Sequence, residues 1–206
     1  MHIEFKDYRE SLPSAVRLPK LDYTYEEVSS VMITEMLDLH YSKLHQGYID
    51  RYNKAQSSMN LTQLIYTPEK EEEKALLFNL GGFLNHSLFW KSFNPNKETH
   101  ILSDKLEHLI KKSFQKDLCE EIVDMLPKIR GSGWIWLTYC KATDLLQLEI
   151  TMNQDFPNTP ILLNIDLWEH AYLIQYKVDK VQYITSLYSI LNWKFASERL
   201  DRILNE

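Results

Sequence analysis

The sequence has little of what marks secreted, membrane or nucleic-acid-binding proteins. Its 206 residues include two cysteines, Cys119 and Cys140, which lack the spacing of a metal site and fit a reduced compartment. No apolar run approaches the roughly 18 residues that span a bilayer, and residues 1–20 contain no apolar core of a secretory signal. The formal net charge of −6 argues against a general nucleic-acid footprint, which needs a basic surface.

The composition that remains is that of an ordinary globular protein. With 44% hydrophobic and 12% aromatic residues, the chain can bury a sizeable core in one or two domains. Asn94, Pro95 and Asn96 interrupt the helical pattern and form the best candidate boundary. We therefore expect an N-terminal extension over residues 1–17, a helical domain over 18–94 and a second domain over 95–206.

The first half of the chain predicts two long antiparallel helices. Thr24 and Glu27 have the form of a capping box, and apolar residues then recur at steps of three and four as far as Tyr48, which predicts one long helix. A second helix is predicted to start at residues 67–69 and to run through residue 90, after a polar, irregular segment over residues 54–64. Each helix turns one histidine inward, His40 on the first and His86 on the second.

The second half predicts a mixed α and β structure. Two short helices are expected over residues 103–113 and 117–128, followed by strands over 134–139 and 145–151. A third, apolar strand starts at residue 161 and precedes Asp166; helical periodicity returns from residue 168 and again over 181–191. The fold class is therefore α+β, with a helical hairpin followed by an α/β domain that contains three strands.

Asp166 and His170 stand four residues apart at the end of the third strand, where both can reach one ion. Together with His40 and His86 they make three imidazoles and one carboxylate, a set that suits Mn, Fe or Zn and does not suit Ca or Mg. The residues alone leave another interpretation open, in which the histidines are satisfied core residues and the Asp–His pair lies at the surface.

At this point the sequence resembles the iron/manganese superoxide dismutase family. The shared stretches run in order over nearly the whole chain: Leu18-Pro19-x-Leu21 with Tyr23, Leu39-His40-x-Ser42-Lys43-x-His45-x-x-Tyr48, Asn85-His86-Ser87-Leu88-Phe89-Trp90, Gly131-Ser132-Gly133-Trp134-x-Trp136-Leu137, Asn153-Gln154-Asp155 and Asp166-x-Trp168-Glu169-His170-Ala171-Tyr172. The combination is highly specific.

The resemblance implies the fold of that family, with a three-stranded antiparallel sheet in the C-terminal domain and one Mn or Fe ion between the two domains. It implies the conversion of superoxide to dioxygen and hydrogen peroxide. Four residues match the family's metal ligands, with a solvent molecule as the fifth: His40, His86, Asp166 and His170.

The resemblance also implies roles for residues around the metal. Gln154 matches the glutamine that hydrogen-bonds the metal-bound solvent, and Tyr48 matches the tyrosine at the substrate funnel. Glu169 matches the glutamate that reaches the metal-binding histidine of a partner subunit, which implies a homodimer through Glu169 and His170. Three residues match aromatic walls of the site: Trp90, Trp134 and Trp168.

The position of the glutamine favours manganese over iron. In iron-type members it tends to sit four residues before the second histidine ligand, which here is Gly82, whereas this chain carries Gln154 on the later strand. Members of the family occur in the mitochondrial matrix and in bacterial cytoplasm, so we expect one of these two compartments and no secretion.

Two departures from the family pattern keep an alternative open. Leu44 and Leu173 stand where the family usually has a histidine and a tyrosine that meet across the dimer, while Lys180 keeps a basic residue near the mouth of the site. The alternative is a structural subunit of a large mitochondrial ribosomal or respiratory assembly, descended from a superoxide dismutase. A hydrolase or oxygenase built on two histidines and one carboxylate is disfavoured by the third histidine and by Gln154.

Overall fold

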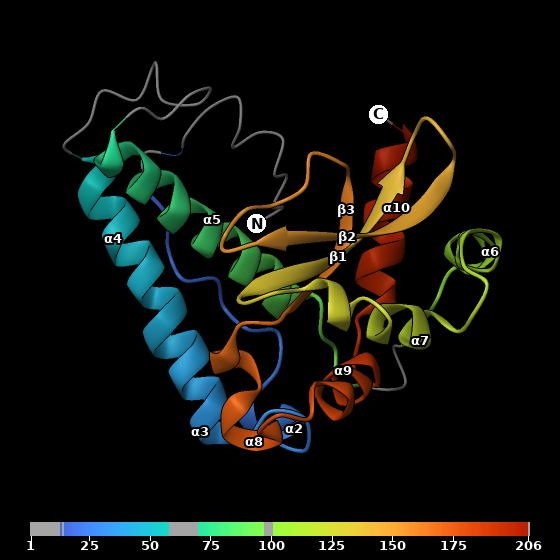
Figure 1. Cartoon of the computed structure of the whole chain (residues 1–206), viewed down its shortest axis with the longest axis horizontal. Coiled ribbons are helices and arrows are strands. Elements are labelled where there is room, and N and C mark those ends of the chain that lie inside the picture. Colours follow the sequence, from blue (N-terminus) through green and yellow to red (C-terminus); the bar gives the residue numbers. More distant parts are fainter. Residues whose placement is uncertain (1–12, 14, 58–69, 97–100, 206) are drawn as a thin grey trace.

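The chain folds into a helical hairpin that lies beside a three-stranded sheet with its own helices. The computed structural model describes residues 13, 15–57, 70–96 and 101–205. Figure 1 shows α4 and α5 side by side, with the sheet beyond α5 and α10 on the far side of the sheet. The predicted fold class is confirmed, whereas the domain division at residues 94 and 95 stays a prediction.

The first predicted helix is present in pieces, and the expectation of one continuous helix is wrong. The Thr24 capping box is present and opens α2 (Tyr25–Val28), but α2 ends after one turn and α3 (Thr34–Leu37) starts separately. The break is held by distant side chains, because Tyr176 donates to the Val31 carbonyl and Gln175 accepts from the Ile33 amide. Periodicity could not reveal these contacts, which satisfy backbone groups that a continuous helix would have paired.

The helix that follows α3 contains a wide turn at the position of His40. Residues Asp38–His45 form the π-helix η1, which continues into α4 (Gln46–Gln56). In a regular α-helix, at 3.6 residues per turn, His40 and His45 would point about 140° apart. The wider π-helical turn brings both inward, and both are buried. Single π-turns are frequent at functional sites.

The second long helix, α5 (Glu71–Lys91), passes through the middle of the molecule. Its predicted start at residues 67–69 lies outside the described residues, and Lys70 is the N-cap. Glu71, Glu72 and Glu73 occupy the first turn, where acidic residues complement the helix dipole. Every residue from Asn79 to Trp90 is buried, because this part of the helix packs against both α4 and β3.

The sheet matches the prediction closely. Its strands β1 (Gly133–Cys140), β2 (Leu145–Met152) and β3 (Ile161–Asp166) are antiparallel in the order β2-β1-β3. The two short helices before it are α6 (Asp104–Ser113) and α7 (Leu118–Val123), and a 3-10 turn, η4 (Leu126–Lys128), follows α7. Trp134 pairs with Asp166 in the register of β1 and β3.

The chain ends in a helix that the sequence reading missed. After η5 (Glu169–Ala171), α8 (Leu173–Tyr176) and α9 (Lys180–Tyr188), the prediction stopped helical structure at residue 191, but α10 (Trp193–Asn205) follows. The Asn192 side chain accepts from the Phe195 amide and caps this helix. Arg199 of α10 donates to the Ile161 carbonyl of β3.

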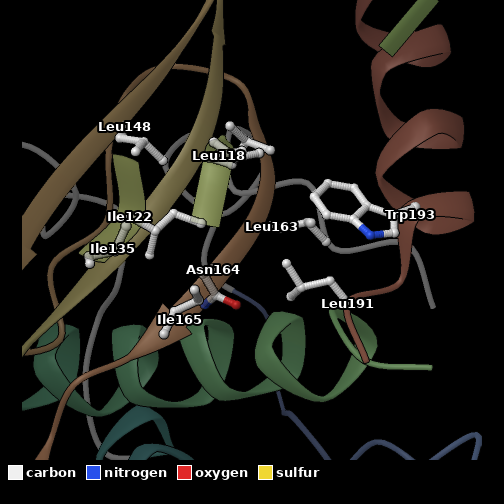
Figure 2. A pocket seen from close by; sticks show the side chains of 10 residues that line it. Leu118, Ile122, Ile135, Leu148, Leu163, Asn164, Ile165, Leu191 and Trp193 are labelled. Atoms are coloured by element: carbon white, nitrogen blue, oxygen red, sulfur yellow. The ribbon is translucent and has the colours of Figure 1, made fainter. Parts of the chain in front are cut away.

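A small apolar hollow lies between the sheet, α7 and the segment that leads into α10 (Figure 2). Ten residues line it: Leu118, Ile122, Ile135, Leu137, Leu148, Leu163, Asn164, Ile165, Leu191 and Trp193. None of the four predicted ligands is among them, so this hollow is separate from the candidate site. In the part of the chain that the structure describes, no helix has the length and apolar character needed to cross a membrane.

Candidate metal centre

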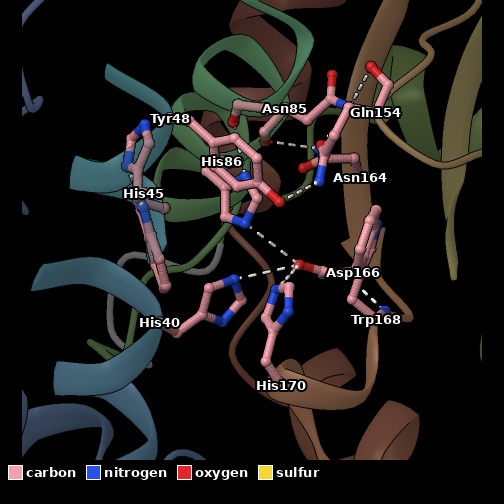
Figure 3. Close-up of polar contacts among 12 residues, drawn as sticks. His40, His45, Tyr48, Asn85, His86, Gln154, Asn164, Asp166, Trp168 and His170 are labelled. Carbon is pink, nitrogen blue, oxygen red and sulfur yellow. Dashed lines mark hydrogen bonds and ion pairs between the residues drawn. The ribbon is translucent and has the colours of Figure 1, made fainter. Parts of the chain in front are cut away.

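The structure brings the four predicted ligands together from four separate elements (Figure 3). His40 comes from η1, His86 from α5, Asp166 from the end of β3 and His170 from η5, and their potential ligand atoms all lie within 4.8 Å of one another. Asp166 Oδ2 lies 3.1 Å from His40 Nε2, 3.6 Å from His86 Nε2 and 3.3 Å from His170 Nε2. Four atoms therefore converge on one point.

These four atoms are buried and have no hydrogen-bond partner among the described residues. His40, His86 and Asp166 are at most 1% exposed, and the His170 side chain is 15% exposed. A buried polar atom without a partner costs about 1 to 3 kcal/mol, and four at one point are hard to explain in a chain that folds without a bound group. Three imidazole nitrogens and one carboxylate oxygen fit a first-row transition metal ion.

Local hydrogen bonds orient two of the predicted ligands, His86 and Asp166, towards the place where the four atoms converge. His86 Nδ1 donates to the Gly82 carbonyl at 2.6 Å, which leaves Nε2 without a proton and turned towards the centre. Asp166 Oδ1 accepts from the Trp168 amide at 2.8 Å, so Oδ2 faces the histidines. Tyr183 donates to the backbone carbonyl of Asp166 and fixes the end of β3.

The charge states of these groups suit a metal ion. Burial by itself raises the pKa of Asp166, but the close approach of the His170 and His40 imidazoles outweighs it and holds that pKa well below its usual range. Burial lowers the pKa of His40 to about 4 and lowers the pKa of His86 well below its ordinary value. At neutral pH the carboxylate is charged and these two imidazoles are neutral, as metal ligation requires.

A fourth histidine at the site, His45, is buried and supports the site without joining it. His45 Nδ1 accepts from Trp90 Nε1 at 3.0 Å, and its Nε2 donates to the Phe83 carbonyl at 3.1 Å. Its ring stacks against the His86 ring at 5.4 Å between centroids. From the sequence alone we assign His45 no role, because in a regular helix it would point away from His40, and only the π-helical turn brings it inward.

Gln154 lies at the edge of the centre, just beyond the end of β2. Asn153 turns the chain with a positive φ of 54°, a conformation that asparagine tolerates better than most residues. Gln154 is 2% exposed, and its Nε2 donates to Tyr48 Oη at 3.1 Å. Asn85 Nδ2 donates to Gln154 Oε1 at 3.2 Å, a contact that the sequence reading missed although an asparagine on a buried helix pointed to it.

Each of the three predicted tryptophans contacts a different one of the three histidines predicted to be ligands. The distance between ring centroids is 4.8 Å for Trp90 and His40, 5.1 Å for Trp134 and His86, and 5.6 Å for Trp168 and His170. Trp90 and Trp134 are buried, while Trp168 is half-buried and donates from Nε1 to the Asn153 carbonyl. The aromatic rings therefore shield the four converging atoms from bulk water.

Comparison with known proteins finds one family along most of the chain. Residues 15–94 match the alpha-hairpin domain of iron/manganese superoxide dismutases, and residues 102–199 match the C-terminal domain of the same family. A superoxide dismutase [Mn] of Chlamydia pneumoniae is 35% identical over 91% of this chain and 96% of its own length. The chain belongs to the iron/manganese superoxide dismutase family.

Two further superoxide dismutase relatives extend this similarity to eukaryotes. A mitochondrial superoxide dismutase [Mn] of Drosophila melanogaster is 35% identical over 88% of this chain and 87% of its own length. One of Capsicum annuum is 36% identical over 88% of this chain and 84% of its own length. The alternative of a structural subunit gains no support from these relatives.

The residues where the chain departs from the superoxide dismutase pattern lie at or near the surface. Leu173 is 44% exposed and Leu44 is half-buried. Of the residues that keep the pattern, Glu169 is exposed beside the predicted ligand His170. Lys180 lies half-buried with its Nζ 5.1 Å from the centre of the Tyr172 ring. These positions sit outside the buried cluster, so the departures leave the four converging atoms intact.

Proposed function

We propose that this protein is a superoxide dismutase that holds one manganese ion per chain with His40, His86, Asp166 and His170. It converts two superoxide anions and two protons into dioxygen and hydrogen peroxide. The observation that carries the proposal is the convergence of four buried ligand atoms without hydrogen-bond partners, in a chain of this family. When bound, the manganese ion supplies the one-electron couple that this reaction needs.

The ligand residues are suited to hold a redox ion rigidly. The Gly82 carbonyl fixes the His86 imidazole, and the Trp168 amide fixes the Asp166 carboxylate. Hydrogen bonds of this kind orient ligands and tune a metal's potential. Trp90, Trp134 and Trp168 keep the surroundings apolar, which strengthens the electrostatic influence of each polar group in the site.

Tyr48 and Gln154 are the residues we assign to proton handling. Burial raises the pKa of Tyr48, so Oη keeps its proton at neutral pH. Because Gln154 Nε2 donates to that oxygen, the Tyr48 hydroxyl hydrogen is free to be donated to another acceptor. Asn85 holds the far side of the Gln154 amide. We assign Tyr48 the delivery of protons through water, and Gln154 the control of how readily protons are taken up at the site.

Manganese is preferred over iron because of where the glutamine lies. Gly82, the position at which iron-type members carry it, has no room for a side chain: a Cβ there would lie 2.5 Å from the Tyr48 ring. Relatives of bacterial and eukaryotic origin are named for manganese. The four ligand types bind either ion, so iron is the alternative cofactor.

We also propose a homodimer formed through Glu169 and His170. Glu169 is exposed beside a ligand histidine, and the neighbouring Leu173 offers apolar surface to a second copy. The site of action is the mitochondrial matrix if the source is a eukaryote and the cytoplasm otherwise; the relatives from Drosophila melanogaster and Capsicum annuum are named mitochondrial.

Replacement of one ligand tests the proposed centre. His170→Ala removes one of four donor atoms, so we expect loss of stoichiometric manganese and of superoxide consumption, measured by elemental analysis and by stopped-flow assay. His108→Ala, at an exposed histidine on α6, is the matched control and should retain both. A His170→Ala protein that kept its metal and its activity would refute the assignment.

A further inference from the structure

An arginine lies over the ring of the tyrosine that we place in the reaction. The guanidinium carbon of Arg51 is 5.1 Å from the centre of the Tyr48 ring, a cation–π distance. The Tyr48 ring also neighbours the His86 ring, whose centre lies 5.2 Å from its own. Tyr48 is therefore close both to an exposed cation and to a buried ligand of the proposed metal centre.

Specific contacts hold Arg51 in this position. Its Nε donates to Asn79 Oδ1 at 2.9 Å, and Asn79 Nδ2 donates to the Ala75 carbonyl one turn earlier in α5. Gly47 leaves space for the arginine, because a Cβ at that position would lie 3.0 Å from a terminal guanidinium nitrogen. The side chain thus crosses from α4 to α5 beside Tyr48.

The positive charge of Arg51 has no ion-pair partner within 4.0 Å among the residues that the structure describes. The neighbouring carboxylate of Asp50 instead accepts from Gln46 Nε2 at 2.7 Å. An exposed arginine that has no carboxylate partner among those residues presents several N–H donors that suit an anion. In a chain of net charge −6, such a local cation matters for a negatively charged substrate.

We propose that Arg51 attracts the superoxide anion to the Tyr48 side of the site and raises the rate at which substrate enters. This inference rests on the proposed function, since superoxide is the anion concerned. Arg51 contacts none of the four ligands, so it acts on the approach of the substrate and not on the metal. If Arg51 instead served only to pack on Tyr48, its replacement would change the rate by an amount that does not depend on the salt concentration.

The test compares manganese-loaded wild type with Arg51→Gln and Arg51→Lys. We expect Arg51→Gln to lower kcat/KM for superoxide about two- to fivefold at low ionic strength and to flatten its dependence on salt, because one steering charge is lost. Arg51→Lys keeps the charge and should retain most of the rate. Lys141→Gln makes the same change in net charge at an exposed residue in the β1–β2 turn and should leave both quantities unchanged.

A second readout separates this inference from the proposed function. The affinity for azide, a small anion, is measured by optical titration of the same manganese-loaded proteins, and Arg51→Gln should weaken it about two- to fivefold at low ionic strength only. If the wild type binds manganese yet consumes no superoxide, the proposed function fails while the azide comparison still tests Arg51. Equal rates, salt slopes and azide affinities in wild type and Arg51→Gln would overturn the inference. Equal, salt-independent losses in both Arg51 variants would also overturn it.

Discussion

At the scale of single residues, His86 and Asp166 each use one polar atom for a contact within the protein and leave the other for the proposed metal ion. His86 gives Nδ1 to the Gly82 carbonyl and Asp166 accepts the Trp168 amide with Oδ1, so each keeps one atom for the centre. His45 uses both ring nitrogens for protein contacts and keeps none. This difference explains why His86 is a proposed ligand and His45 is not.

Gln154→Ala tests whether the outer amide serves the reaction. The change removes the donor to Tyr48 Oη without touching any proposed ligand, so we expect manganese to remain and turnover to fall by about 10- to 100-fold. Steady-state kinetics and metal analysis of the same sample measure both. Gln147→Ala, at an exposed position on β2, is the control. Unchanged turnover in Gln154→Ala would refute the role.

Buried neutral histidines predict that the metal-free protein loses stability in acid. Burial lowers the pKa of His45 to about 3 and that of His40 to about 4, whereas both titrate near 6.5 when unfolded. Below about pH 6.5 the unfolded chain therefore binds more protons than the native state. The free energy of unfolding should fall as the pH drops towards 4, by up to about 1.4 kcal/mol per pH unit for each such group.

Urea unfolding of metal-free protein at several pH values measures this slope. His45→Gln should make the slope shallower, because it removes one of the contributing imidazoles while keeping a polar side chain. Stability that stayed level or rose on acidification between about pH 6.5 and 4 would contradict the prediction.

At the scale of elements, helix α5 can pass close to the site because it carries two adjacent glycines. A Cβ on Gly81 would lie 2.1 Å from the Gln154 carbonyl oxygen, and one on Gly82 would lie 2.5 Å from the Tyr48 ring. Glycine in a helix interior costs about 1 kcal/mol relative to alanine, so both sites give up helix stability for close packing. The segment with Gln154 and the Tyr48 ring both depend on that space.

Gly81→Ala should therefore displace the backbone at Gln154. We expect a loss of about 1 to 3 kcal/mol in the free energy of unfolding, because the contact is with backbone that cannot move freely, together with reduced turnover. Gly47→Ala is a helical control, since its nearest neighbour is the flexible end of Arg51. Chemical unfolding compares the two, and equal stability in both would argue against a tight contact at Gly81.

The sequence predicted the elements whose signals are local. The Thr24 capping box, the three strands and the inward position of His86 follow from neighbouring residues, and the structure contains them. The break after Val28 depends on Gln175 and Tyr176, more than 140 positions away, and no local pattern encodes it. The π-helical turn was likewise invisible to a reading that assumed one helical period.

The candidate site was predictable because its residue types are rare on apolar faces. Two inward histidines and an Asp–His pair suggested a metal, and the resemblance brought them together as one set. The supporting contacts of Asn85 and Arg51 were missed, since each depends on a side chain from another element. Polar contacts between distant elements do not produce a periodic pattern in the sequence, so they could not be predicted from it.

At the scale of the whole molecule, the site lies where the hairpin meets the sheet domain. Two ligands come from the hairpin elements η1 and α5 and two from β3 and η5, so a bound ion ties both halves together. A group that binds only the native state stabilises it. The beginning of α8 next to His170 also leaves Leu173 exposed to solvent.

That exposed surface predicts a dimer that can be broken by one charge. Wild type should sediment as a dimer in analytical ultracentrifugation, and Leu173→Glu should sediment as a monomer, because a symmetric interface would place like charges close together. Ile101→Glu alters an apolar side chain that is 62% exposed elsewhere and should remain dimeric. A wild-type monomer, or an unaltered Leu173→Glu dimer, would contradict this interface.

The most direct test of the central claim is elemental analysis and a superoxide-consumption assay on one purified wild-type sample. We predict close to one manganese ion per chain, with iron as the alternative, and rapid loss of superoxide. A properly folded protein that contained neither metal, or that contained it and left superoxide untouched, would contradict the account.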